Sequence, residues 1–180
     1  MYLTNYSCGD IIIFVIRDLI RNRDIIMDKT ACVIGDNKDK FPKDKIEICS
    51  KNLEKLINDE KVTTFYFADI TELFAISLVS LIKLKKEYTH IKIIFVVDAE
   101  PEDMKVSTYK DLISIFDDVL FMPLHNKAIL VTLNEKVIEM SDVVIIDKTK
   151  ETPDYDLINR FISFAKEKNK IIKNIFEDNE

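Results

Sequence analysis

The stretch TACVIGDNKDKFP, residues 30–42, decides the fold of this 180-residue chain. Its first part, residues 31–34, is apolar and partly β-branched, which is typical of a buried strand. The strand ends at Gly35, one of two glycines in the chain, and a charged loop follows. A strand that ends in glycine and leads towards a helix is a common phosphate-binding arrangement in α/β proteins. The stretch therefore predicts an α/β fold and raises the question of whether a nucleotide site remains at Gly35.

The rest of the chain alternates between strand-like and helix-like segments. Short β-branched or aromatic runs are separated by segments of helical periodicity. The predicted strands are residues 31–34, 63–67, 91–97, 119–122, 143–146 and 170–175. Apolar stripes predict helices that include residues 46–57, 70–86, 109–116 and 157–165. Apolar strands separated by helices indicate a parallel sheet covered on both faces, and right-handed crossovers make it doubly wound. We therefore predict a Rossmann-like α/β sandwich.

The first 29 residues stand outside this alternation. Residues 10–23 can form a helix with Asp10 as its N-cap and an apolar side that includes Ile12 and Ile16. Such a helix either packs on the edge of the domain or serves as a dimerisation arm. We therefore divide the chain into an N-terminal helical extension, residues 1–29, and a Rossmann-like domain, residues 30–180.

Composition narrows the expected partners and location. The net charge of −6 and the pI near 5.1 provide no basic surface, so we expect no nucleic-acid partner. No apolar run approaches the roughly 20 residues needed to cross a bilayer, so we expect no membrane association. The three cysteines are odd in number and lack CxxC spacing, which favours reduced thiols and a cytoplasmic location.

The carboxyl ends of the strands are where open α/β sheets bind ligands. The residues expected there are Gly35, Asp36, Asn37, Lys38, Ala68, Asp69, Thr71, Glu72, Asp98, Glu100, Asp147 and Lys148. This edge is mostly acidic, and beyond Gly35 it offers no glycine for close approach of a phosphate. Its carboxylates could in principle hold Mg²⁺ or Ca²⁺, but their spacing does not match a calcium loop, so we predict no metal site.

Four segments resemble a known family: TACVIGDNKDKFP, TTFYFADITELFAIS, KEYTHIKIIFVV and TLNEKVIEMSDVVII. They are similar to successive blocks of the YpsA-like branch of the SLOG superfamily, Rossmann-type domains thought to bind nucleotides or nucleotide-derived ligands. The resemblance covers residues 30–97 and about 111–175, and leaves out residues 1–29. It implies a small, nucleotide-derived ligand. The ligand-binding residues that we predict are Gly35, Asp36, Asn37, Asp69, Glu72, Asn134, Ser141 and Asp142.

The ligand motifs of that family are altered in this chain. In the family the first strand ends in a Gly-His-Arg-Pro loop, of which only Gly35 is kept, since residues 36–38 are Asp, Asn and Lys. The glycine-rich turn after the second strand is replaced by a turn with Asp69 and Glu72, and Phe74 takes the position of an aspartate. Asn134 and the pair Ser141-Asp142 agree with the family. The resemblance therefore implies a degenerate site.

The turn after the second strand can also be interpreted without the family. The sequence Asp69-Ile-Thr-Glu72 has the form of a capping box, in which Asp69 would accept from the helix and Glu72 would reach back. Two carboxylates would then satisfy the free amides of the helix and repel a phosphate. We therefore predict that this helix end is not an anion site.

Catalytic machinery is not evident in the sequence. There is no GxSxG elbow and no suggested Cys–His pair, so we predict no catalytic residue and no cofactor. The function that we predict is a degenerate, non-catalytic SLOG-like domain that acts by ligand sensing or protein contacts. The alternative is an active nucleotide-binding or nucleotide-processing enzyme of the same superfamily. The apolar helix predicted over residues 70–86 is either buried or an interface of a homo-oligomer.

Overall fold

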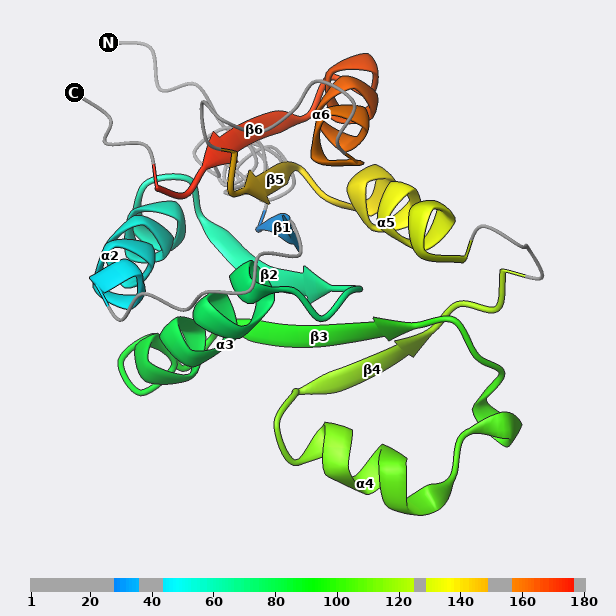
Figure 1. Ribbon diagram of the computed structural model, residues 1–180. Helices are drawn as coiled ribbons and strands as arrows, with labels where there is room; N and C mark the ends of the chain where they lie inside the picture. The colour runs from blue at the N-terminus through cyan, green and yellow to red at the C-terminus, as the bar shows by residue number, and fades with distance from the viewer. Residues whose placement is uncertain (1–27, 36–43, 125–128, 149–156, 177–180) are drawn as a thin grey trace, which may run out of the picture.

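The computed structural model of the protein describes residues 28–35, 44–124, 129–148 and 157–176. The predicted extension, residues 1–29, therefore lies almost entirely outside the described residues, and the domain division stays a prediction. Figure 1 shows the chain as a central sheet with helices on both sides.

Six strands form one sheet in the order β4-β3-β2-β1-β5-β6, and every neighbouring pair is parallel. The strands are β1 (Lys29–Ile34), β2 (Val62–Phe67), β3 (Lys92–Val97), β4 (Asp118–Phe121), β5 (Val143–Ile146) and β6 (Ile171–Asn174). Their apolar, β-branched sequences suit a sheet that is covered on both faces. The predicted α/β, Rossmann-like fold is confirmed.

The helices and one short 3-10 turn fill the connections between strands. They are α2 (Asp44–Asn58), α3 (Glu72–Leu84), η1 (Pro101–Asp103), α4 (Val106–Ile113), α5 (Ile129–Met140) and α6 (Leu157–Glu167). The chain runs outward from β1 to β4 and then returns through α5 to β5 on the other side of β1. The strand order therefore reverses between β1 and β5, and this is the switch point at which doubly wound folds bind ligands.

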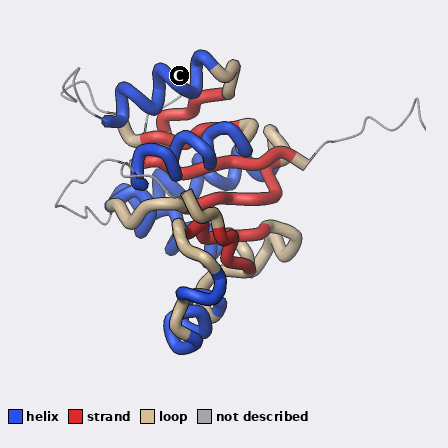
Figure 2. Tube along the Cα trace, turned by 90° about the vertical axis from the view of Figure 1, so that its right-hand side faces the viewer, coloured by secondary structure: helices blue, strands red, loops and turns tan. Residues whose placement is uncertain are grey.

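Two apolar layers enclose the sheet, because successive residues of a strand point to opposite faces. Ala31 and Val33 of β1 pack with α2 and α3, whereas Cys32 and Ile34 pack with α5 and α6. Figure 2 shows the strands between the helical layers from the side. The helix predicted over residues 70–86 is buried along one side, but Val79 and Ile82 of α3 remain 41% and 43% exposed.

Candidate functional site at the carboxyl edge

The carboxyl ends of β1 and β5 meet at the switch point. Ile34 pairs with Ile146, so the residues that follow them, Gly35 and Asp147, lie at the same place on the sheet edge. The predicted position of Gly35 at the end of the first strand is confirmed. Asp36 and Asn37 lie outside the described residues, so their predicted role stays a prediction.

Gly35 is required by the approach of α3. It has no positive φ, so a left-handed backbone is not the reason for glycine at this position. A Cβ atom at Gly35 would overlap the Thr71 hydroxyl and lie 2.7 Å from the Leu73 Cβ. The glycine therefore allows the N-terminus of α3 to pack directly against the end of β1.

The N-terminus of α3 is capped by Thr71 and not by Asp69. The Thr71 Oγ1 accepts a hydrogen bond from the Phe74 amide at 3.1 Å, and the backbone of Thr71 is extended. Asp69 instead accepts from the adjacent Ile70 amide at 2.8 Å. The predicted capping box of Asp69 and Glu72 is therefore wrong, because packing of Thr71 against Gly35 places the helix start two residues later.

Glu72 occupies the first turn of α3, where the helix dipole favours a negative charge. Its side chain is 8% exposed, and its Oε1 atom has no hydrogen-bond partner among the described residues. A shielded carboxylate oxygen without a donor is costly, by about 1–3 kcal/mol or more. The position at which related folds hold a phosphate thus carries a buried carboxylate of the chain itself.

Asp147 lies on the β5 side of the switch point. It is 6% exposed and forms an ion pair with Lys45, with 3.4 Å between Oδ2 and Nζ. The same Nζ lies 4.6 Å from the centre of the Phe176 ring, in cation–π geometry. Lys45 and Asp147 are 102 residues apart in the sequence, so the strand pattern predicts Asp147 at this edge but does not predict its pairing with Lys45.

Ser141 and Asp142 lie at the opposite, amino edge of the sheet, immediately before β5. The Ser141 hydroxyl donates to the Val137 carbonyl at 2.8 Å, and the Asp142 carboxylate accepts from the Thr30 amide at 2.9 Å. Asn134 is buried on α5. The structure therefore brings Gly35, Asp69 and Glu72 to one edge and places Ser141 and Asp142 at the other.

Thiol chemistry is not favoured at the two described cysteines. Cys32 and Cys49 are free and buried. Burial raises the pKa of Cys32 to about 12, and the Ser141 hydroxyl offsets only part of this rise. Burial also raises the pKa of Cys49, and hydrogen bonding from Ser77 lowers it only in part. Both thiols therefore stay protonated at neutral pH and are poor nucleophiles.

The described ranges contain neither a metal-binding cluster nor a membrane-spanning helix. No group of three or more His, Cys, Asp or Glu side chains there is arranged to hold a metal ion. Asp98, one of the acidic edge residues, accepts from the Leu124 amide at 2.7 Å and so has a structural role. Within the same ranges, no helix has the length and apolar character that spanning a membrane requires.

Solved structures similar to this chain include two of low sequence identity. No family model and no curated protein matches the sequence. The molybdenum cofactor carrier protein MCP of Chlamydomonas reinhardtii is 10% identical, with a TM-score of 0.48 over 81% of this chain and 74% of that chain. DNA processing protein A of Helicobacter pylori is 16% identical, with a TM-score of 0.49 over 86% of this chain and 71% of that chain. Neither similarity assigns a function, and the class of protein, a Rossmann-like α/β domain, rests on the sheet itself.

One expectation is corrected by these comparisons. The structure of DNA processing protein A is described as showing a mode of single-stranded DNA binding. The exclusion of nucleic acid as a partner, which the sequence analysis drew from the net charge, is therefore contradicted. Net charge is a property of the whole chain and does not describe a local surface, so it could not support that exclusion.

Proposed function

We propose that this chain is a non-catalytic SLOG-like domain, related to the YpsA-like branch, that acts by binding a small ligand or a protein partner. The proposal extends the confirmed Rossmann-like fold with the sequence resemblance in residues 30–97 and 111–175. The cytoplasmic location that we propose fits two buried, free thiols.

The observation that carries the proposal is the state of the α3 N-terminus. The Phe74 amide in the first turn of α3 already donates to the Thr71 hydroxyl. The carboxylate of Glu72 is buried in the same turn. A phosphate placed there would lose donors and meet a like charge. At about 4 Å and an effective dielectric constant near 20, that repulsion is on the order of 4 kcal/mol for each charge pair.

The described residues also lack an evident catalytic pair. The described thiols are buried and protonated, and the described histidine, His90, is exposed beside the Tyr88 ring. A general base must lie within hydrogen-bonding reach of the group that it activates. This arrangement supports binding over chemistry, and Gly35, Asp69 and Glu72 are the residues we place at the binding edge.

Product analysis tests the absence of catalysis. The full chain is incubated with nucleoside monophosphates and with ADP-ribose, and the products are separated by chromatography. We expect no turnover above that of a buffer control. Turnover that is lost in Glu72→Gln or Asp147→Asn would show that the carboxyl edge is an active site and would contradict the proposal.

A further inference from the structure

A second site is suggested by a groove beside the last strand of the sheet, one end of which reaches the carboxyl end of that strand at Asn174. It runs between α2 and the edge strand β6, on the face of the sheet that α2 covers, and has a cavity volume of about 200 Å³. Pockets for drug-sized ligands are typically larger, about 300–1,000 Å³. The groove is therefore suited to a ligand much smaller than a nucleotide.

The walls of the groove carry charges of both signs. Lys55 comes from α2, Asp59 and Glu60 directly follow α2, and Lys173 comes from β6. The formal charges of these four side chains cancel, with two cations and two anions. A wall of this kind is complementary to a ligand that is neutral overall but carries separated charges.

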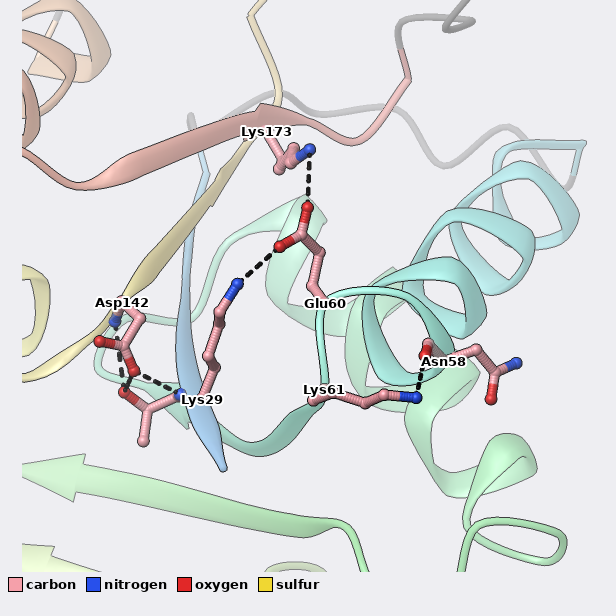
Figure 3. A network of polar contacts seen from close by, with 7 residues as sticks. Lys29, Asn58, Glu60, Lys61, Asp142 and Lys173 are labelled. Carbon is pink, nitrogen blue, oxygen red and sulfur yellow. Dashed lines mark hydrogen bonds and ion pairs between the residues drawn. The ribbon is translucent and has the colours of Figure 1, made fainter. Parts of the chain in front are cut away.

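Glu60 is already committed to contacts within the protein. Its Oε2 accepts from Lys29 at 2.7 Å, and its Oε1 lies 3.4 Å from the Nζ of Lys173, as Figure 3 shows. These two lysines lower the pKa of Glu60, the hydrogen bond from Lys29 having the largest effect. The groups left for a ligand are the ammonium of Lys55, the remaining donors of Lys173 and the carboxylate of Asp59.

Two asparagines, Asn52 and Asn174, stand at one end of the groove, and a backbone carbonyl holds the amide side chain of each. The Nδ2 of Asn52 donates to the Ile175 carbonyl, and the Nδ2 of Asn174 donates to the Lys148 carbonyl, both at 2.6 Å. These bonds fix which way each amide faces. The Oδ1 of Asn174 is shielded and has no donor among the described residues. Asn174 pairs with Ile146, whose side chain packs in the α5–α6 layer, so its amide side chain lies on the face opposite to Lys173 and is not a ligand group of the groove.

We propose that this groove binds a free α-amino acid. The ligand carboxylate lies between the ammonium groups of Lys55 and Lys173, and its ammonium group lies against Asp59. An apolar ligand side chain can pack on Leu56, which also lines the groove. Charge-assisted hydrogen bonds at both ends select the zwitterion over an anion or a cation that carries only one of the two groups.

Calorimetric titration of the full chain tests this assignment. The probes are glycine, alanine, serine and leucine, and each is compared with the matching acid that lacks the amine, the matching amine that lacks the carboxylate, and inorganic phosphate. We expect at least one α-amino acid to bind at millimolar concentration or tighter, and all three comparison classes to bind at least about tenfold more weakly.

Variants locate the binding. Lys55→Met and Lys173→Met should each weaken amino-acid binding by about tenfold or more. Lys51→Met, an exposed residue of the same helix outside the groove, is the matched control and should bind like the wild type. Circular dichroism melts check that each variant is folded. The assignment is overturned if no α-amino acid binds, if phosphate or a comparison compound binds equally well, or if Lys55→Met binds like the control.

Discussion

The two edges of the sheet are built differently. At the amino edge, aspartates accept from the amide of the second residue of a strand: Asp142 from Thr30 at 2.9 Å, and Asp117 from Ile93 at 2.8 Å. At the carboxyl edge, Glu72 is buried with an oxygen that has no donor among the described residues. The comparison teaches that the aspartates of the amino edge hold neighbouring segments in place, whereas Glu72 at the carboxyl edge keeps an oxygen that no described donor reaches.

The largest effect is expected where the carboxyl edge is packed most closely. Gly35→Ala places a methyl group against Thr71 and Leu73, with 2.7 Å to the Leu73 Cβ. Overpacking of this kind costs about 1–3 kcal/mol, and we expect about 2 kcal/mol because two neighbours must move. Denaturant unfolding measures the loss. A change below about 0.5 kcal/mol would show that α3 does not approach Gly35 in this way.

The next effect tests the amino edge. Asp142→Ala removes the acceptor for both the amide and the hydroxyl of Thr30, so we expect a loss of about 1.5 kcal/mol in the free energy of unfolding. Asp142→Asn keeps one acceptor oxygen and should lose less. If ligand binding is weakened while stability is unchanged, Asp142 is a ligand residue, as the family resemblance implied, and the contrast between the edges is wrong.

A smaller effect separates the two candidate caps of α3. Thr71→Ala removes the hydrogen bond to the Phe74 amide and should cost about 1 kcal/mol, whereas Thr71→Ser should retain most of it. Asp69→Ala serves as the control and should change the unfolding free energy much less. The reverse ranking would restore Asp69 as the cap.

The smallest effect concerns pH. The pKa of Glu60 is lowered from its ordinary value of 4.5, chiefly by the hydrogen bond from Lys29. A lowered pKa in the folded state stabilises the protein above the unfolded pKa, and this contribution is lost as the pH falls below about 4.5. Glu60→Gln should therefore show a flatter decline in unfolding free energy between about pH 5 and pH 3. The difference should be a few tenths of a kcal/mol, since the pair is partly solvated. Identical pH profiles for the wild type and Glu60→Gln would show that Glu60 makes no such contribution.

The fold was predictable because its signals are local. The apolar, β-branched run at residues 143–146 matches β5 residue for residue, and the run at residues 31–34 forms the buried part of β1. Such runs have few alternatives to a buried parallel strand once helices separate them. The polar ends of the strands carry less information, since DITE permits a helix start at either Asp69 or Thr71.

The candidate site was only partly predictable, because its decisive contacts are not local. Thr71 becomes the cap through its packing on Gly35, 36 positions earlier in the sequence. Lys45 meets Asp147 only in the folded sheet. The agreement of Ser141-Asp142 with the family has a structural explanation here, since Asp142 holds the amino end of β5 next to β1 and Ser141 bonds back to α5. Short polar motifs cannot show which edge of the sheet they will reach.

The central claim is that the α3 N-terminus is occupied by the chain's own groups and takes no phosphate. The most direct test is the melting temperature of the wild-type chain with a nucleoside monophosphate. A ligand that binds the folded state at 100 times its dissociation constant would add about 2.7 kcal/mol, which is several degrees for a domain of this size. We predict no saturable change for the wild type. A saturable rise of several degrees that disappears in Gly35→Ala would contradict the account and would make this edge a working nucleotide site.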